Sequence, residues 1–252
     1  MERDLIDRLA KIEGLHWWYE ARRKAVEAFL KGRISRSGQI LDVGAGTGGN
    51  YHLLSQFGDY CGVEPSAEAR EWAKSKGVEN LVSGTAEKIP YPPQTFDLVV
   101  ALDVLEHLKE DLAALEEFHR VLRDRGLLLI TVPAFNFLWS RHDELNHHFR
   151  RYRLKEIKKK LELSGFEVEK ATYFYFFLFP FFFLLRILQK FIPERSALSS
   201  VELKLPPLFI NRLLVRLCLI EVSVIKWCSL PLGSSIIVLA KKRETGAKEV
   251  RT

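Results

Sequence analysis

A glycine-rich segment flanked by two carboxylates is the strongest chemical signal in the sequence. Residues 42–49 read DVGAGTGG and directly follow a short apolar run, and Glu64 stands 18 positions after Gly46. Glycines lack a Cβ atom, so the backbone can turn tightly and approach a ligand. The helix expected next offers free N–H groups, and a carboxylate at Glu64 can accept hydrogen bonds from ribose hydroxyls. The segment therefore predicts a nucleotide-type cofactor site.

The charge of Asp42 distinguishes between two cofactor classes that use such loops. Gly44-x-Gly46-x-x-Gly49 also matches the dinucleotide fingerprint, so the glycine spacing does not decide the cofactor. A carboxylate just before the first glycine repels an anionic pyrophosphate and attracts a cofactor with an ammonium and a sulfonium group. We therefore favour the sulfonium cofactor, and an NAD-dependent oxidoreductase that uses the same loop is the alternative.

Four motifs in order resemble the class I S-adenosylmethionine (SAM)-dependent methyltransferases. They are ILDVGAGTGGN at 40–50, GVEPS at 62–66, SGTAEKIPYPPQTFDLVVALDVLEHL at 83–108 and LRDRGLLLITVP at 122–133. The resemblance covers roughly residues 38–170 and recurs in the last strand. It implies an α/β fold with a Rossmann-like, doubly wound sheet of seven strands, SAM as the cofactor, and methyl transfer as the reaction.

The resemblance also assigns cofactor residues by position. The aspartate and glycines would line the methionine end of SAM, and the glutamate would hold the ribose hydroxyls. The next two motifs would supply residues beside the adenine and residues that flank the cofactor. Many relatives carry Asp where this chain has Thr85. The assigned residues are Asp42, Gly44, Gly46, Glu64, Thr85, Ala86, Leu102 and Asp103.

The motif HWWYEARR at residues 16–23 resembles the N-terminus of one bacterial and archaeal subset of these enzymes, where such a segment covers the cofactor. This resemblance implies that Trp17 and Tyr19 shield the cofactor from water. Arg22 or Arg23 would pair with the SAM carboxylate, because arginine recognises carboxylates through two parallel hydrogen bonds, and we assign Arg22 to this role. Plain aromatic packing of an amphipathic helix is an equally weighted alternative.

Two histidine-bearing segments are candidates for acceptor chemistry. Glu106-His107 follows the fourth strand, at the sheet edge where ligands bind in such folds, and a histidine there can take a proton near neutral pH. After the fifth strand, SRHDELNHHFRRY at 140–152 also resembles the subset. Packing and ion pairing are the alternatives for both segments. We expect catalytic roles for His107, His142 and Asp143, and acceptor binding by His147, Arg151 and Tyr152.

We expect no metal ion in the 140–152 segment. A His, Asp and His set on a loop, without an i,i+4 pair on a helix that matches a known site, is a weak metal signal. The three cysteines have no CxxC spacing, which also excludes a cysteine zinc site and a disulfide scaffold.

Alternating strands and helices must position these residues. The runs Gln39–Val43, Phe96–Leu102 and Gly126–Val132 are typical of strands buried on both faces of a parallel sheet. Strands that alternate with helices predict an α/β sheet with helices on both faces. The predicted parts are an N-terminal helical lid (1–37), a SAM-binding core (38–172), an apolar helical insert (173–234), and the last strand with a polar tail (235–252).

The insert is both apolar and basic. Eight of the seventeen Phe lie between Phe174 and Phe191, and residues 173–252 carry a net charge of +7 against −1 for residues 1–172. The near-neutral first part argues against a nucleic-acid partner. The charge-free run Tyr173–Leu185 is shorter than the roughly 20 residues that a membrane-spanning helix needs. We expect it to be buried or interfacial, with a dimer interface or internal lid packing as alternatives.

These observations predict a SAM-dependent methyltransferase that acts on a small or lipid-linked acceptor, with O-methylation at the membrane surface as the specific hypothesis. Residues 173–192 would make the peripheral membrane contact, because aromatic residues flanked by Lys and Arg suit an apolar–water boundary. The N-terminus lacks a secretory signal, which predicts a cytoplasmic protein at the inner face of the membrane. A catalytically inactive, membrane-associated interaction protein is a further alternative.

Overall fold

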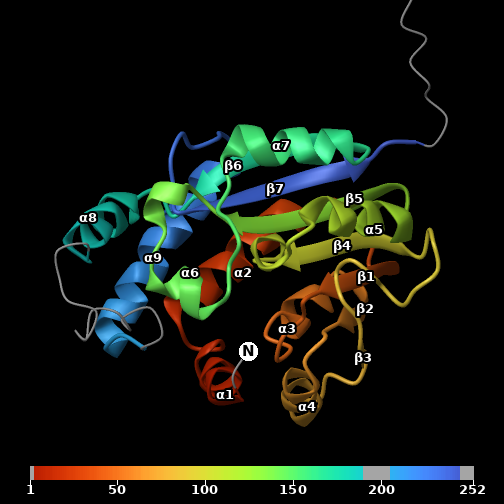
Figure 1. Ribbon diagram of the computed structural model, residues 1–252, viewed down its shortest axis with the longest axis horizontal. Coiled ribbons are helices and arrows are strands. Elements are labelled where there is room, and N and C mark those ends of the chain that lie inside the picture. The colour runs from red at the N-terminus through yellow and green to blue at the C-terminus, as the bar shows by residue number, and fades with distance from the viewer. Residues whose placement is uncertain (1–2, 190–204, 245–252) are drawn as a thin grey trace, which may run out of the picture.

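A computed structural model describes residues 3–189 and 205–244. Seven strands form one mixed sheet in the order β3-β2-β1-β4-β5-β7-β6 (Figure 1). Only β7 among these strands runs antiparallel to its neighbours β5 and β6. The strands are β1 (Gly38–Val43), β2 (Gly58–Val63), β3 (Leu81–Val82), β4 (Phe96–Leu102), β5 (Leu122–Pro133), β6 (Phe166–Phe174) and β7 (Ser235–Lys242).

Helices cover both faces of this sheet, which confirms the predicted doubly wound fold (Figure 1). The α-helices are α1 (Arg3–Ile12), α2 (Trp17–Leu30), α3 (Tyr51–Leu54), α4 (Ala67–Ser75), α5 (Asp111–Val121), α6 (Arg141–Leu145), α7 (Leu154–Leu163), α8 (Phe179–Gln189) and α9 (Leu208–Ile225). Two short 3-10 helices, η1 (Leu105–His107) and η2 (Asn136–Leu138), follow β4 and β5.

Two hydrophobic cores form because successive side chains of each central strand point to opposite faces. Val99 and Ala101 of β4 belong to the core that includes α5 and α7. Leu98 and Val100 belong to the other core, which includes α2 and α9. Burial on both faces explains why β4 and β5 read as near-continuous apolar runs in the sequence.

The predicted lid and insert form one layer of this second core. α2 packs against α9, and Ala21, Val26 and Leu30 of α2 are fully buried. The side chain of Asn211, in α9, accepts a hydrogen bond from the Trp17 N–H at 2.9 Å and donates one to the Leu15 carbonyl at 2.9 Å. Segments 1–37 and 173–234 therefore share a core with the sheet through their described residues.

The insert begins later than residue 173. β6 runs to Phe174, and Tyr173 pairs with Ile236 of β7, so the first two residues of the apolar run belong to the sheet. The Glu221 carboxylate accepts hydrogen bonds from the N–H groups of Phe176 and Phe177, which fixes α9 to the turn before α8. Residues 190–192 of the expected membrane contact lie outside the described residues.

The carboxyl ends of β1, β4 and β5 lie at one edge of the sheet, because these strands are parallel. Asp103 after β4 and Phe135 after β5 both have positive φ angles, of 56° and 58°. Such conformations cost energy in residues other than glycine and gather at functional sites. Within residues 3–189 and 205–244, no helix combines the length and the apolar character needed to cross a membrane.

Candidate active site

The glycine loop (residues 42–49) connects β1 to α3 and leaves open space at one position. Gly44 and Gly46 have φ angles of +68° and +55°, which glycine adopts without a Cβ clash. A Cβ atom built at Gly44 would lie 2.7 Å from Val104 Cγ2. A Cβ atom built at Gly46 would meet no atom of the described chain within 4 Å beyond its sequence neighbours. The loop thus packs closely at Gly44 and is open at Gly46.

Glu64 ties the end of β2 to this loop. Its Oε2 atom accepts a hydrogen bond from the Gly46 N–H at 2.9 Å, and Oε1 accepts one from the Ser66 N–H at 2.9 Å. Each carboxylate oxygen has a second lone pair, so both can still accept a hydroxyl donor. The side chain is 8% exposed, which places it at the base of the open space rather than in bulk solvent.

Asp42 carries a buried carboxylate oxygen that needs a partner. Its Oδ2 atom accepts a hydrogen bond from the Tyr60 hydroxyl at 3.2 Å, whereas Oδ1 has no hydrogen-bond partner among the described residues. Burial raises the pKa of Asp42 to about 7. An unpaired buried carboxylate is costly, so this site is suited to a cationic ligand group.

Arg22 provides the complementary donor from α2. Its Nη1 atom lies 2.5 Å from Asp103 Oδ2, and the Thr131 hydroxyl donates to Asp103 Oδ1 at 2.9 Å. Burial opposes the charge of Arg22, but Asp103 raises its pKa above the ordinary value. The Nε–H of Arg22 is buried and finds no acceptor in the part of the chain that the structure describes. It can therefore donate to a ligand carboxylate.

The remaining cofactor residues predicted from sequence have mixed environments. Ala86 and Leu102 are buried, whereas Thr85 is exposed. The Cζ atom of Arg22 lies 5.3 Å from the centre of the Tyr19 ring, over its face. Burial raises the pKa of Tyr19. The ring of Trp17 packs edge-on against Tyr175 at 5.7 Å and stacks with Phe182 at 6.3 Å. The aromatic-packing alternative describes these contacts of Trp17, and its role as a cofactor shield stays a prediction.

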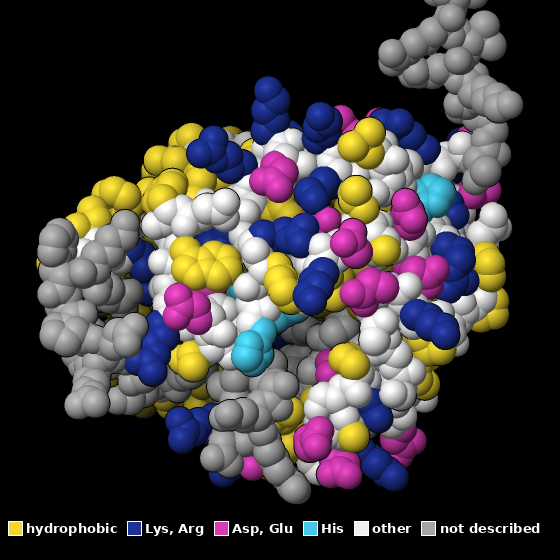
Figure 2. Space-filling view, viewed as in Figure 1, with side chains coloured by type: hydrophobic (Ala, Val, Ile, Leu, Met, Phe, Trp, Pro, Cys, Tyr) yellow, Lys and Arg dark blue, Asp and Glu magenta, His cyan; other side chains and the backbone are white. Residues whose placement is uncertain are grey.

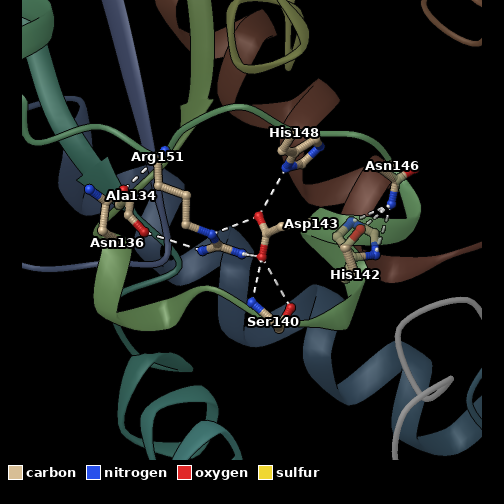
Figure 3. A network of polar contacts seen from close by, with 8 residues as sticks. All are labelled: Ala134, Asn136, Ser140, His142, Asp143, Asn146, His148 and Arg151. Carbon is tan, nitrogen blue, oxygen red and sulfur yellow. Dashed lines mark hydrogen bonds and ion pairs between the residues drawn. The ribbon is translucent and has the colours of Figure 1, made fainter.

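Asp143 is the centre of a buried polar network on the acceptor side (Figure 3). Arg151 donates to both of its oxygens, at 2.8 and 2.9 Å, and His148 Nδ1 lies 2.9 Å from Oδ1. The Ser140 N–H also donates to Oδ2, at 2.8 Å. Burial alone would raise the pKa of Asp143, but the hydrogen bonds from His148 and Arg151 hold it well below its usual value.

This network engages three residues that the sequence assigned to catalysis or acceptor binding. Asp143 is 0% exposed, and both of its oxygens accept hydrogen bonds. Arg151 donates to Asp143 and to the Ala134 carbonyl. Tyr152 is 0% exposed, and its hydroxyl donates to Asp111 Oδ2 at 2.8 Å. Such internal partners are usual for buried polar groups, and the catalytic role of Asp143 and acceptor binding by Arg151 and Tyr152 stay predictions.

Three histidines, His107, His142 and His148, lie near one another, whereas His147 is exposed. His142, in α6, contacts Asn146, and its ring centre lies 6.0 Å from that of His148. His107 packs edge-on against His148 with ring centres 4.6 Å apart. Burial, followed by the charge of His148, lowers the pKa of His107 to about 4, so its ring is neutral at pH 7.

Glu106 belongs to the same site, although our sequence-based set of site residues omits it. It is 1% exposed and follows β4 directly before His107. Burial raises its pKa well above the ordinary value, and the neighbouring charge of Asp103 adds to the shift. Its adjacency to His107 was the available signal, but its buried orientation depends on the loop that brings His148 against it.

Comparisons of the sequence with known proteins find methyltransferases. A family model described as "Methyltransferase domain" matches residues 41–130. "Uncharacterized methyltransferase YcgJ" of Bacillus subtilis is 33% identical over 51% of this chain and 53% of that protein. "Norajmaline N-methyltransferase" of Rauvolfia serpentina is 33% identical over 50% of this chain and 46% of that protein. The chain spans about half the length of these two curated relatives.

A solved structure shares the whole fold. A Thermotoga maritima protein described as a SAM-dependent methyltransferase, possible histamine N-methyltransferase, aligns over 94% of both chains with a TM-score of 0.59 and 20% identity. At this identity the likeness concerns the fold. The residues at the sheet edge fit the cofactor of such proteins, because Asp42 Oδ1 can receive a cationic group and Arg22 Nε a carboxylate.

Proposed function

We propose that the protein is a class I SAM-dependent methyltransferase that transfers a methyl group to the hydroxyl of a small or lipid-linked acceptor. The observation that carries this proposal is the pair of buried, unpartnered atoms beside the open glycine loop. Among the described residues, Asp42 Oδ1 and Arg22 Nε have no hydrogen-bond partner. An amino acid ligand with one ammonium and one carboxylate would satisfy both.

Methyl transfer from a sulfonium is an in-line displacement in which the protein supplies alignment and desolvation. When bound, SAM supplies the electrophilic methyl group. Asp42 and Arg22 would hold its amino acid end, and Glu64 would accept hydrogen bonds from its ribose hydroxyls. These three side chains come from β1, α2 and the end of β2, so the fold fixes their relative positions.

An acceptor hydroxyl must lose its proton during the transfer. His107 is neutral at pH 7 because burial lowers its pKa to about 4, so a ring nitrogen can accept a hydrogen bond from an acceptor hydroxyl. His148, held by Asp143, lies against it. This arrangement favours an oxygen acceptor. The curated relative from Rauvolfia serpentina is named for N-methylation, and nitrogen is therefore the main competing acceptor atom.

Exposed apolar side chains on α8 and α9 support a lipid-linked acceptor. Phe181 of α8 and Phe209 of α9 are 62% and 78% exposed. Phe181, Leu184 and Leu188 recur at helical spacing, which gathers them on one side of α8, and exposed Phe177 lies in the turn before this helix. Figure 2 shows apolar side chains concentrated at the left of the view, where α8 lies in Figure 1. A patch of this kind suits contact with an apolar phase.

This apolar surface continues toward the acceptor side. Phe137 of η2 packs edge-on against Phe179 at 6.3 Å and against Phe183 at 5.9 Å, both in α8. η2 leads directly into α6, which carries His142 and Asp143. Exposed Arg212 and Arg216 add positive charge on α9. We infer a peripheral contact with an anionic membrane through which the acceptor enters.

The test has two steps. Isothermal calorimetry should show binding of S-adenosylhomocysteine (SAH), the product form of the cofactor, by the full chain. Gly46→Arg should abolish it and Asp42→Asn should weaken it about tenfold, while circular dichroism stays unchanged in both, and NADH should not bind. Isotopic methyl-SAM labelling of a cell extract with the purified protein should then place the label in the lipid fraction. NADH binding without SAH binding would overturn the proposal, and label confined to protein would overturn the acceptor class.

A further inference from the structure

Glu106, His107 and His148 each offer one ligand atom, and these atoms all lie within 4.8 Å of one another. We propose that these three side chains, the Glu–His–His cluster, bind one divalent transition-metal ion, which replaces our sequence-based expectation of no metal ion in the 140–152 segment that contains His148. Glu106 and His107 belong to η1 after β4, and His148 belongs to the loop after α6. The Phe149 N–H donates to the Glu106 carbonyl at 2.7 Å, which anchors that loop against η1.

Both histidines have the outer hydrogen bonds that metal ligands usually show. His148 Nδ1 is hydrogen-bonded to Asp143, which leaves Nε2 as the ligand atom. His107 makes a hydrogen bond to the backbone of Asn146. Metal-bound histidines commonly use the second ring nitrogen in this way, because a carboxylate or carbonyl partner fixes the tautomer and the ring orientation. Arg151 and Ser140 hold Asp143 in turn (Figure 3).

The third ligand is an unexplained buried acid. Glu106 is 1% exposed, and its Oε2 atom is buried without a hydrogen-bond partner in the described chain. A buried polar atom without a hydrogen bond lowers the free energy of unfolding, because it loses its contacts with water and gains none in the protein. A cation coordinated by this oxygen would remove that cost. This observation is independent of the spacing of the two histidines.

The chemistry of the ligands selects the class of metal. Two imidazole nitrogens and one carboxylate suit Zn²⁺, Co²⁺, Mn²⁺ or Fe²⁺, whereas Mg²⁺ prefers an all-oxygen shell. Three protein ligands also leave coordination positions open, as in catalytic zinc sites. Ligand atoms around a four-coordinate zinc ion lie roughly 3.3 Å apart, given bonds of about 2.0–2.1 Å. The cluster atoms lie within 4.8 Å of one another, so they have to approach by up to about 1.5 Å on binding.

Binding of the ion is independent of the proposed methyl transfer. The role that we give the ion in the reaction rests on that proposed function. An open coordination position beside the sheet edge would bind the acceptor hydroxyl and favour loss of its proton to solvent water. The ion would occupy the free His107 ring nitrogen, so the metal would replace the hydrogen bond that this nitrogen otherwise offers to the hydroxyl. The cluster would thus select acceptors with an oxygen able to coordinate a metal.

The test is a metal titration of untagged, full-length protein after chelator treatment. Co²⁺ absorption in the visible range and calorimetry with Zn²⁺ should show one equivalent bound, with Mg²⁺ at least tenfold weaker. Glu106→Gln and His148→Gln should each weaken Zn²⁺ binding at least tenfold. His147→Asn, in the same loop at an exposed position with a φ of 55° that Asn tolerates, should bind as the parent does.

SAH binding is measured for every variant as well, so that failure of the metal site can be told apart from failure of the proposed methyl transfer. Absence of stoichiometric Zn²⁺ and Co²⁺ binding by the parent protein overturns the metal site even if SAH still binds. Equal weakening by His147→Asn and Glu106→Gln also overturns it, because the ion would then sit elsewhere. Metal binding without SAH binding would instead support the cluster and contradict the proposed methyl transfer.

Discussion

The guanidinium of Arg22, in α2, forms an ion pair of 2.5 Å with Asp103, the residue that follows β4. This pair joins the N-terminal helical layer to the edge of the sheet where the cofactor residues meet. It also explains how Asp103 keeps a positive φ of 56°, since Thr131 and Arg22 both hold its carboxylate. The cofactor site is thus assembled from the N-terminal helix α2 and the end of the central strand β4.

Arg22→Lys should weaken SAH binding about tenfold, or about 1.4 kcal/mol. Lysine keeps the charge that pairs with Asp103, but it lacks the Nε–H that we assign to the ligand carboxylate. Calorimetry measures the effect. Arg23→Lys is the matched control, because Arg23 donates to the Glu13 carbonyl and should change SAH affinity less than twofold. Equal losses in the two variants would contradict the assignment of Arg22.

SAM affinity should rise between pH 6 and pH 8, by up to about tenfold. Burial raises the pKa of Asp42 to about 7, so its ionised fraction grows from about one-tenth to about nine-tenths across this range. The ionised form attracts the cationic cofactor. Calorimetry at several pH values measures the slope, which Asp42→Asn should remove. SAM affinity that does not change with pH in the parent protein would show that Asp42 does not contact the cationic group of SAM.

The contribution of Asp42 to the stability of the ligand-free protein should fall as pH rises, whereas SAM affinity should increase. Its pKa is raised in the folded state, so its contribution to stability is complete below about pH 4 and is lost as pH rises through about 7. Asp42→Asn should therefore raise the melting temperature more at pH 8 than at pH 5. An equal change at both pH values would mean that the carboxyl titrates normally.

Asp143→Asn should destabilise the protein by about 3 kcal/mol, because it leaves the buried Arg151 guanidinium without its counter-charge. Urea unfolding measures the loss. Glu144→Gln is the control, since Glu144 is an exposed residue of the same helix α6 and its change should stay within about 0.5 kcal/mol. If both variants unfold at the same urea concentration, the network adds little to stability.

Leu184→Asp on α8 should reduce co-sedimentation with anionic phospholipid vesicles at least fivefold. The substitution places a charge on the exposed apolar patch, where Leu184 is 55% exposed. Leu163→Asp makes the same change at a 72% exposed position on α7, away from α8 in Figure 1, and should leave vesicle binding unchanged. If the parent fails to sediment with vesicles, or both variants lose binding alike, the membrane contact is wrong.

The sequence by itself determined the sheet and the glycine loop. β1 and β4 are short runs whose apolar character follows from burial on both faces, so local pattern was enough to locate them. Asp42 and Glu64 were recognisable because Asp42 lies near the end of β1, just before the glycine loop, and Glu64 directly follows β2. These features depend on residues that are neighbours in the chain.

Only the tertiary structure decided which polar side chains face a ligand and which face each other. HDELNHHFRRY looked like one acceptor-binding segment, yet Arg151 and Tyr152 turn inward to Asp143 and Asp111. Glu106 gained its importance from His148, which lies 42 positions later in the chain. Partners for buried charges are chosen by proximity in space, after the sheet and its layers have formed, and sequence spacing does not carry that information.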